Sequence, residues 1–519
     1  MMRRFLENLE INRYEAYLIL SLTFIHTLLA YNLGLSPDEA HYALYAKFID
    51  WSYYDHPPMV GWMQYIFYTL SEKEISLRVI PIVSWMTSLL LVLHLNQKVK
   101  IKLFDASKLK ATPVNIRVSI LLFAFSPLLH LLSIALVPDT LLIPLVLLIM
   151  SVTWDLIQIE DIDRSSWRNW LQLGVLLGLA GLTKYTAVLF ALSAAVLILY
   201  KYGPKVLLTY KIWVAIAIAL IFISPVLIWN LQHDWISFRY QLNHAAGSND
   251  WILRKCVLFA LVVYLAYGPL LFNGIFKKAT AIHEEKQNEI KHFFLVFSIP
   301  SLILLLVLSG RGSTLPHWAA PAVVALIPFV AFKLENINHE TSRTFKYTLI
   351  LQIVSTAVLM VFLTTAGLGS ERNLEKISNY KNTDIRSQNN PIADLYGWES
   401  AGQRSREITK KYTLEKIAVS NWTLASRIAW YARPLSVNVI DNHHDQFDIW
   451  FGSLKKNDSI LWVDWSMMPF EAPIGKNKFE SCELIDQLPI IHLGRQISHF
   501  NFSICKNWLG EEHQLETNP

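Results

Sequence analysis

Apolar runs long enough to cross a lipid bilayer recur along the first two thirds of the chain, and they limit the folds open to it. A helix needs about 17–25 such residues to span a membrane. Hydrophobic residues make up 53% of the 519 residues and charged residues only 17%, which is too apolar for an ordinary soluble domain. The sequence predicts a polytopic α-helical membrane protein with about eleven spans. We place the spans at 14–34, 76–96, 117–134, 139–157, 169–184, 186–201, 209–229, 252–275, 293–309, 317–333 and 347–367.

The segments between these runs differ in charge. One set is basic, and by the positive-inside rule it faces the cytoplasm. The other set holds every unusual polar motif, so we expect an active site on the outer face of the membrane. The first run has no small-residue cleavage pattern and is expected to stay as a helix rather than be removed as a signal peptide. The basic set consists of Arg3, Arg4, Lys98, Lys100, Lys102, Lys108, Lys110, Arg117, Lys201, Lys205, Lys211, Lys277, Lys278, Lys286, Lys291, Lys333, Arg343 and Lys346.

From about residue 368 the chain becomes polar, and short β-rich runs alternate with helical stretches. This alternation is typical of a small α/β domain. We therefore expect two domains, a transmembrane domain over 1–367 and an extracytoplasmic α/β domain over 368–519. Strands are expected at 416–420, 435–441, 459–465 and 499–507, and a helix at 424–432.

The chain has three cysteines. Cys256 lies in an apolar run, where we expect it to be a packing residue. Cys482 and Cys505 both lie in the tail, where an oxidising compartment would permit a disulfide. Two free buried thiols fit the sequence equally well, because spacing does not fix the geometry that a disulfide needs.

The stretch SPDEAHYALYAKFIDW follows the first apolar run. Ser36, three residues before Glu39, forms a capping box, and Pro37 occupies the favoured first position of a helix. The cap accounts for Glu39 in structural terms, although a catalytic role stays open for it. It does not account for Asp38, which we take as the leading candidate for chemistry. His41 and Tyr42 follow as candidates for substrate binding.

The next stretch, WSYYDHPPMVGW, contains a proline pair that halts any helix and fixes an extended corner. Its aromatic residues fit the belt found at membrane interfaces. An acid and an imidazole held next to two prolines do not follow from that belt. Asp55 and His56 are therefore candidates for substrate binding.

Further candidates lie in the other outward segments. Asp139 stands between two apolar runs, where a charge is expensive and marks either a functional group or a carboxylate at a helix start just outside the membrane. Lys184 either extends to the membrane surface or binds an anion, and Tyr185 follows it. Arg311 lies in a Gly-Arg-Gly turn that would let a guanidinium and backbone N–H groups approach a phosphate. The remaining candidates are His233, Asp234, Arg239, His244 and His317.

Several functional classes find no support. The chain has no P-loop, no Gly-x-Gly-x-x-Gly after a strand, no Gly-x-Ser-x-Gly elbow and no His-Glu-x-x-His. It also lacks the basic stripe and the motifs of nucleic-acid-binding proteins. Acids that can deprotonate a hydroxyl, together with cations that can hold a phosphate, favour group transfer from a lipid-linked phosphate donor.

The motifs resemble the polytopic GT-C glycosyltransferases that use polyprenyl-phosphate sugars. The resemblance is strongest to the bacterial glycosyltransferase family 39, related to the dolichyl-phosphate-mannose protein mannosyltransferases and to the lipid A aminoarabinose transferase. It implies a GT-C fold, an extracytoplasmic active site and an inverting transfer. The stretches that carry it, in chain order, are PDEAHYALYAKFIDWSYYDHPPMVGW, VPDTLLI, GLTKYTA, WNLQHDWISFRYQ, LPHWAAPA, GWESA and ASRIAWYARP.

The resemblance also implies residue roles. The acidic pair Asp38–Glu39 supplies the carboxylate that activates the acceptor hydroxyl, and we assign the base to Asp38. Asp139 matches the second family carboxylate, which orients the acceptor or supports the base. The leading phosphate partners are then Lys184, Arg239 and Arg311.

In the aminoarabinose transferases the corner before the two prolines is Glu-Lys, and its Lys contacts the donor phosphate. Here it is Asp55-His56, so His56 contacts phosphate, pairs with Asp55 or ligates a metal. A divalent metal such as zinc, held by Asp55 and a loop histidine, stays open.

The expected function is that of a membrane glycosyltransferase of the bacterial cell envelope. The donor is a polyprenyl-phosphate sugar, and the acceptor is lipopolysaccharide or its lipid A, another envelope glycan or a protein hydroxyl. The expected location is the inner membrane, with the site facing the periplasm. A transporter or flippase of a lipid-linked sugar is the main alternative, although such proteins often contain internal repeats, and none is visible here. An oligosaccharide polymerase or ligase is a further alternative.

Overall fold

The computed structural model describes residues 11–103, 116–246, 250–276, 284–312, 314–335, 342–367, 393–441, 443–468, 478–492 and 494–510. Part of the basic set lies outside these residues, namely Arg3, Arg4, Lys108, Lys110, Lys277 and Lys278. The side chains of Lys100, Lys102, His244, Lys286 and Arg343 are likewise not among those described.

The chain forms two compact units. Unit 1 contains Met1–Leu28, His56–Val60 and Arg78–Val361, and unit 2 contains Leu29–Asp55, Gly61–Leu77 and Phe362–Pro519. The composition-based division into 1–367 and 368–519 is a different one, because it assigns residues 29–55 and 61–77 to the membrane domain. It stays a prediction about which parts of the chain lie in and outside the membrane.

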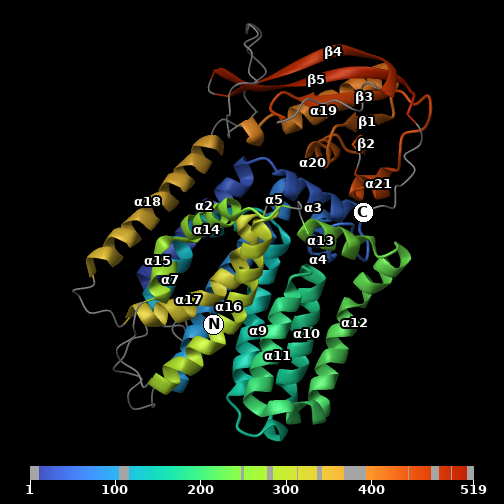
Figure 1. The fold of residues 1–519 in the computed structure, drawn as a ribbon. Coiled ribbons are helices and arrows are strands. Elements are labelled where there is room, and N and C mark those ends of the chain that lie inside the picture. Colours follow the sequence, from blue (N-terminus) through green and yellow to red (C-terminus); the bar gives the residue numbers. More distant parts are fainter. Residues whose placement is uncertain are drawn as a thin grey trace. The chain divides into compact units, whose positions relative to one another are not determined.

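Unit 1 is helical, and Figure 1 shows most of its helices as a bundle. Its main helices are α2 (Arg13–Asn32), α6 (Val79–Leu103), α7 (Ile116–Ala124), α8 (Pro127–Leu132), α9 (Pro138–Ile157), α10 (Trp167–Thr183), α11 (Ala187–Tyr202), α12 (Tyr210–Gln232), α13 (Ile236–Ala246), α14 (Leu253–Tyr267), α15 (Pro269–Ile275), α16 (Glu284–Ser309), α17 (Ala320–Glu335) and α18 (Ser342–Gly367), the last of which continues into unit 2. Short 3₁₀ turns connect some of them, η1 (Ile162–Arg164), η2 (Gly203–Leu208) and η3 (Pro316–Ala319).

Among the described residues, eight helices are long and apolar enough to span a membrane. The pair α14 and α15, bent by 105° at Gly268, would be a ninth. Two of the eleven expected spans do not qualify. The run 117–134 breaks at Ser126–Pro127 into α7 and α8, with Pro127 in the first turn of α8 where its missing N–H is tolerated, and α10 has only 17 residues. The expected polytopic helical architecture is confirmed.

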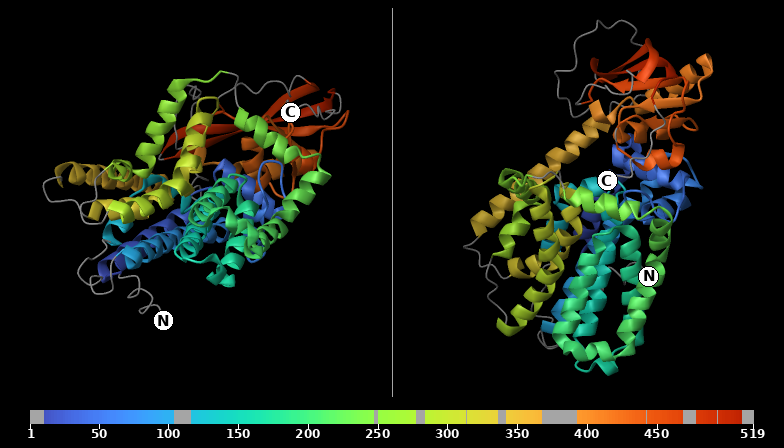
Figure 2. Two further views of the ribbon diagram at one scale, coloured as in Figure 1. Left: turned by 60° about the horizontal axis from the view of Figure 1, so that its bottom comes forward. Right: turned by 45° about the vertical axis from the view of Figure 1, so that its right-hand side comes forward.

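Close packing of α10 on α12 depends on two glycines, and Figures 1 and 2 show these helices side by side. A Cβ added at Gly174 would lie 2.6 Å from the carbonyl oxygen of Ala215, and one added at Gly178 would lie 2.4 Å from Cβ of Phe222. Small residues four apart let helix backbones approach where lipid provides no hydrophobic drive for association. Replacing either glycine would push the two helices apart.

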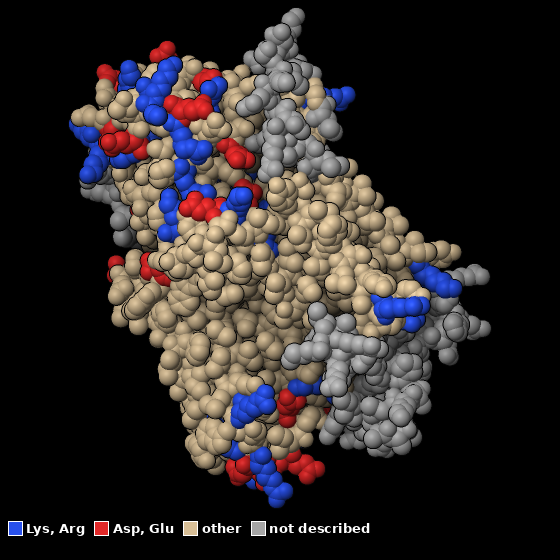
Figure 3. Space-filling model, turned by 180° about the vertical axis from the view of Figure 1, so that it is seen from behind, with Lys and Arg blue, Asp and Glu red and all other residues tan. Residues whose placement is uncertain are grey.

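The surface of unit 1 also fits a membrane. Figure 3 shows a wide band in which no Lys, Arg, Asp or Glu side chain is exposed. Helix α12 illustrates the composition, since its exposed side chains include Ile216, Leu220, Ile221 and Leu231. Large apolar side chains left outside a packed core are expected where lipid replaces water.

Unit 2 is an α/β fold that contains α3 (Pro37–Lys47), most of α4 (Met59–Tyr68) and α5 (Glu74–Leu77) besides the tail. Its sheet has the strand order β2-β1-β3-β5-β4, with β1 parallel to β2 and β3, and with β5 antiparallel to β3 and β4. The tail elements are η6 (Ala393–Leu395), α19 (Trp398–Tyr412), β1 (Lys416–Val419), α20 (Trp422–Tyr431), β2 (Ser436–Val439), α21 (Gln446–Phe451), β3 (Ile460–Trp465), β4 (Phe479–His492) and β5 (Arg495–Trp508). The four expected strands and the expected helix are confirmed, whereas β4 was not expected.

The two tail motifs, GWESA and ASRIAWYARP, form the core of unit 2. The Arg427 guanidinium is almost fully buried, lies 3.5 Å from the centre of the Trp398 ring and donates to the Asp394 carboxylate over 2.9 Å. Helix α20 also packs on α3, and the Tyr431 hydroxyl accepts a hydrogen bond from the Leu35 backbone N–H at 3.0 Å. The tail therefore holds the segment that carries Asp38.

Cys482 and Cys505 face each other across β4 and β5 and are joined by a disulfide. Free thiols, the other interpretation that the sequence allowed, are therefore excluded for this pair. The bridge ties an edge strand to the sheet through a loop closed over a sequence separation of 23 residues. Cys256 is a free, buried cysteine in α14, as expected.

We predict that replacing both bridged cysteines by serine lowers the stability of unit 2, because the unfolded chain regains the freedom that the closed loop removes. For a loop of this length the loss is about 3 kcal/mol. Thermal unfolding in detergent, followed by tryptophan fluorescence, measures it. A reductant should lower the melting midpoint of the wild type and leave the double variant unchanged, and equal effects on both would contradict the prediction.

Candidate active site

The start of α3 has the capping box that the sequence predicts. The Ser36 hydroxyl accepts from the Glu39 backbone N–H at 3.3 Å, and the Glu39 carboxylate accepts from the Ser36 backbone N–H at 3.1 Å. Glu39 is buried and its carboxylate serves this cap. Asp38 is half-buried, and its carboxylate has no hydrogen bond or ion pair within the part of the chain that the structure describes. The Glu39 carboxylate is therefore hydrogen-bonded within the helix cap, whereas the Asp38 carboxylate is not hydrogen-bonded to any described residue.

A second group of polar side chains in unit 2 surrounds Asp55. The Tyr45 hydroxyl donates to Asp55 Oδ1, and His41 Nε2 lies 3.5 Å from the same oxygen. Burial, and then the Asp55 charge, raise the pKa of Tyr45 well above its usual value, so this phenol stays protonated and donates. The structure thus brings His41 and Asp55 together, although they lie in different sequence motifs.

Aromatic rings enclose His41. The rings of Tyr42, Tyr45, Trp422, Phe447 and Trp450 have their centroids 5.2–5.8 Å from that of the imidazole. The other ring nitrogen, Nδ1, lies 3.4 Å from the Ser426 hydroxyl. Four of these contacts come from the tail, so α20 and α21 complete the surroundings of a residue that α3 supplies.

In unit 1, Asp139 and Lys184 form a buried ion pair. Lys184 Nζ donates to both carboxylate oxygens, at 2.8 and 2.7 Å, and the exposed fractions of the two side chains are 9% for Lys184 and 2% for Asp139. His317 Nε2 lies 3.8 Å from Asp139 Oδ2, and the Lys184 ammonium lies 5.2 Å from the centre of the Trp318 ring. Lys184 was expected to bind phosphate, yet two of its hydrogen bonds already go to Asp139.

The remaining candidates lie at helix ends and turns. His56 is half-buried just before the two prolines and α4, and Tyr185 follows Lys184 with its ring against Phe238. Arg239 on α13 donates to the Asp234 backbone carbonyl, in a turn where Asp234 and Trp235 adopt positive φ. Arg311 is exposed in the turn after α16. The roles of these residues stay predictions.

No group of three or more His, Cys, Asp or Glu side chains that could hold a metal ion occurs in the described ranges. The imidazole of His41, which lies in α3 rather than in a loop, is beside Asp55. A divalent metal therefore stays a prediction.

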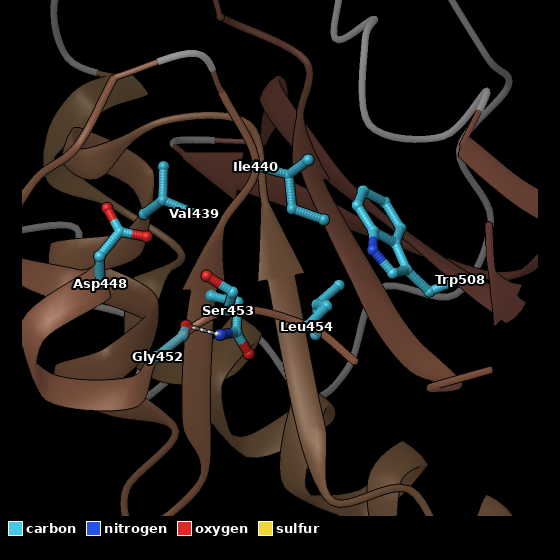
Figure 4. A pocket seen from close by; sticks show the side chains of 8 residues that line it. Val439, Ile440, Asp448, Gly452, Ser453, Leu454 and Trp508 are labelled. Atoms are coloured by element: carbon cyan, nitrogen blue, oxygen red, sulfur yellow. Dashed lines mark hydrogen bonds between the residues drawn. The ribbon is translucent and has the colours of Figure 1, made fainter. Parts of the chain in front are cut away.

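Unit 2 also has a pocket, which Figure 4 shows from close by. Its empty volume, which includes the part open to solvent, is about 290 Å³. The residues that line it include Val439, Ile440, Leu454, Asp448 and Trp508. The dashed line in Figure 4 marks the 2.6 Å bond from the Asn438 amide to the Gly452 carbonyl. None of the predicted site residues lines this pocket, so we do not place the sugar site there.

Sequence reasoning missed the stretch DNHHDQFD, residues 441–448, at the start of α21. His444 lies with its ring 5.6 Å from that of Tyr54, and Gln446 accepts a hydrogen bond from the Tyr54 backbone N–H at 2.7 Å. The density of acids and imidazoles in this stretch is a sequence signal of a possible site, and it could have been recognised from the sequence. Only the fold reveals that they reach the Asp55 corner.

Comparison with known proteins agrees with this fold. Residues 55–229 match the family model described as dolichyl-phosphate-mannose-protein mannosyltransferase. The lipid A galacturonosyltransferase RgtD of Rhizobium johnstonii is 24% identical over 289 residues, which cover 56% of this chain and 58% of that protein's length.

Two crystal structures of ArnT from Cupriavidus metallidurans superpose on 94% of this chain and 97% of theirs. The apo form gives a TM-score of 0.56 at 12% identity, and the form bound to undecaprenyl phosphate gives 0.57 at 13%. The chain has the GT-C fold of ArnT. The resemblance to GT-C glycosyltransferases of the family 39 type, inferred from the motifs, is confirmed.

We predict that Lys184→Met destabilises the protein by about 3–5 kcal/mol, because it leaves Asp139 as a buried charge without a partner. The double variant with Asp139→Asn should recover most of that loss, since neither charge then remains. Thermal melts of the single and double variants measure the coupling. Additive losses in the double variant would show that the two charges do not depend on each other.

The Asp445 carboxylate gives unit 2 a pH dependence. Its Oδ1 accepts from the Phe447 backbone N–H at 2.7 Å, whereas its Oδ2 is buried without a hydrogen-bond partner among the described residues. Burial, followed by the nearby Asp448 charge, raises the pKa of Asp445 to about 7. A carboxyl with a raised pKa contributes stability that is full below its ordinary pKa of 3.8 and is lost as the pH rises through about 7.

We predict that Asp445→Asn raises the melting midpoint relative to wild type, and that the increase is larger at pH 8 than at pH 5. Asparagine keeps the capping oxygen but never carries the buried charge. Melting curves between pH 5 and pH 8 measure the difference. A constant difference across this range would refute the prediction.

Proposed function

We propose that this protein is an inverting glycosyltransferase that moves a sugar from a polyprenyl-phosphate donor to a hydroxyl of a cell-envelope acceptor. One observation carries the proposal: among the described residues, none makes a hydrogen bond or ion pair with the carboxylate of Asp38. A general base needs a carboxylate whose lone pairs are available to the proton it takes. The GT-C fold supports the reaction class.

In the proposed reaction Asp38 takes the proton of the acceptor hydroxyl as its oxygen forms a bond to the anomeric carbon. The bond between that carbon and the phosphate oxygen breaks, and polyprenyl phosphate leaves with the electron pair. Attack from the side opposite to the leaving group inverts the anomeric configuration. No strong general acid is required, because a phosphate is a good leaving group.

Cations hold the leaving phosphate in this proposal, and the charge that develops on it makes such contacts stronger in the transition state. Arg239 and Arg311 supply guanidinium groups. Lys184 contributes through its pair with Asp139, whose carboxylate fixes the ammonium in place, and His317 lies beside that pair. The proposed sugar- and acceptor-binding residues are His41, Tyr42, Asp55, His56 and Tyr185, with Glu39 supporting the start of α3.

The proposed acceptor is lipid A, and the proposed active side of the membrane is the periplasmic one. The similar protein RgtD is named as a lipid A galacturonosyltransferase, and one similar ArnT structure contains undecaprenyl phosphate. Other envelope glycans and protein hydroxyls are the alternative acceptors. The positive-inside arrangement of the basic segments supports the periplasmic side.

A flippase for a lipid-linked sugar is the second candidate, since it too would place charges beside membrane helices. A radiolabelled polyprenyl-phosphate sugar incubated with purified protein and extracted envelope fractions distinguishes the candidates. Label in lipid A supports the proposal, and label in protein or another glycan changes the acceptor. Label that stays on the polyprenyl carrier contradicts transfer altogether.

We predict that Asp38→Asn abolishes transfer while expression and the melting midpoint stay as in the wild type, because an amide cannot take the proton. Asp163→Asn, at an exposed acid in η1, is the matched control and should keep full activity. Initial rates in the radiolabel assay measure both. Near-normal activity of Asp38→Asn would contradict the assignment of Asp38 as the general base.

A further inference from the structure

We propose that Gln446 is a positioning residue for the Asp55 corner, and that α21 fixes this part of the site through it. The proposal rests on the function proposed above, in which Asp55 binds substrate. It adds a residue from the tail that none of the sequence motifs contains.

Gln446 joins two segments that lie 392 residues apart in the chain. The Tyr54 backbone N–H donates to Gln446 Oε1 over 2.7 Å, and Gln446 is only 3% exposed. Tyr54 directly precedes Asp55, so this bond holds the backbone from which the Asp55 carboxylate projects. Because the bond is shielded from water, no solvent molecule easily replaces it.

Two side-chain contacts of Asp55 come from a different element. Tyr45 and His41, which contact its Oδ1, both lie on α3. They fix the carboxylate relative to α3, whereas Gln446 fixes the backbone of the corner relative to α21. The corner is thus held from two sides.

Helix α21 also contacts the same cluster through its side chains. Phe447 and Trp450 lie with their ring centroids 5.8 and 5.7 Å from that of His41, and His444, just before the helix, lies against Tyr54. His444 Nδ1 in turn lies 3.5 Å from the Asp448 carboxylate. These contacts place the Gln446 amide in a fixed frame, which is what a positioning residue needs.

Removal of the acceptor oxygen has a specific consequence. Gln446→Met has a side chain of similar length that cannot accept the Tyr54 N–H, so this hydrogen bond is lost. Gln446→Glu restores an acceptor at the same reach. Loss of one such bond corresponds to about a tenfold change in an equilibrium constant, and we expect that change in the KM for the donor.

The experiment compares wild type, Gln446→Met and Gln446→Glu in the radiolabel transfer assay, with rates expressed per folded protein. Hydrogen–deuterium exchange of the peptide that contains the Tyr54 amide is measured in parallel, and it does not depend on activity. Gln403→Met is the matched control, because Gln403 is an exposed glutamine on α19 of the same unit. The expected result is a KM raised about tenfold in the Met variant, with kcat changed less and with faster exchange at Tyr54. Gln446→Glu and the control should resemble the wild type.

An unchanged KM in Gln446→Met, or a Glu variant as impaired as the Met variant, overturns the proposal. If the Met variant does not fold, Gln446→Asn replaces it, because its amide is one methylene too short to reach Tyr54 and should show the same loss. If the wild type transfers no sugar, the proposed function fails, and the exchange measurement alone decides the positioning role. Unchanged exchange at Tyr54 in Gln446→Met would then overturn that role.

Discussion

A carboxylate takes a proton through a lone pair that no cation or amide of the protein already occupies, and the acids of this chain differ in this respect. Glu39 caps α3, Asp55 accepts from Tyr45, and Asp139 is neutralised by Lys184. Asp38 has no such partner among the described residues. Its place directly before the capping glutamate keeps it at the start of the helix. The assignment of roles thus follows from local bonding and not from the mere presence of acids.

Local signals allowed much of the fold to be predicted. The length of the apolar runs predicted the membrane helices, and the spacing of Ser36 and Glu39 predicted the capping box. Short β-rich runs predicted β1, β2, β3 and β5. Strand β4 was not predicted from the sequence, because it is an edge strand with many exposed residues, several acids and Pro489 inside it. Proline is tolerated at an edge, where a backbone N–H has no neighbouring strand to pair with.

The surroundings of the site could not be predicted, because they depend on contacts between distant segments. Ser426 and His41 are 385 residues apart, and Gln446 and Tyr54 are 392 apart. No periodicity or spacing encodes such pairs. The tail motifs supply Trp398 and Arg427, which belong to the core of unit 2. Their contribution is to hold the frame against which α3 packs.

The Asp139–Lys184 ion pair suggests a functional role, because the stability of the fold does not require charged side chains at these two positions. Removing two charges from water costs several kcal/mol for each ion, and a well-packed apolar pair of similar volume is often as stable or more so. A membrane-spanning bundle with abundant Leu, Ile and Val could therefore fill this place without charges. A bidentate ammonium–carboxylate pair with an imidazole beside it instead provides a positive group held in one orientation at the start of α9 and the end of α10. A departing phosphate would need such a preorganised cation, since a charge fixed before the reaction requires no reorganisation during it.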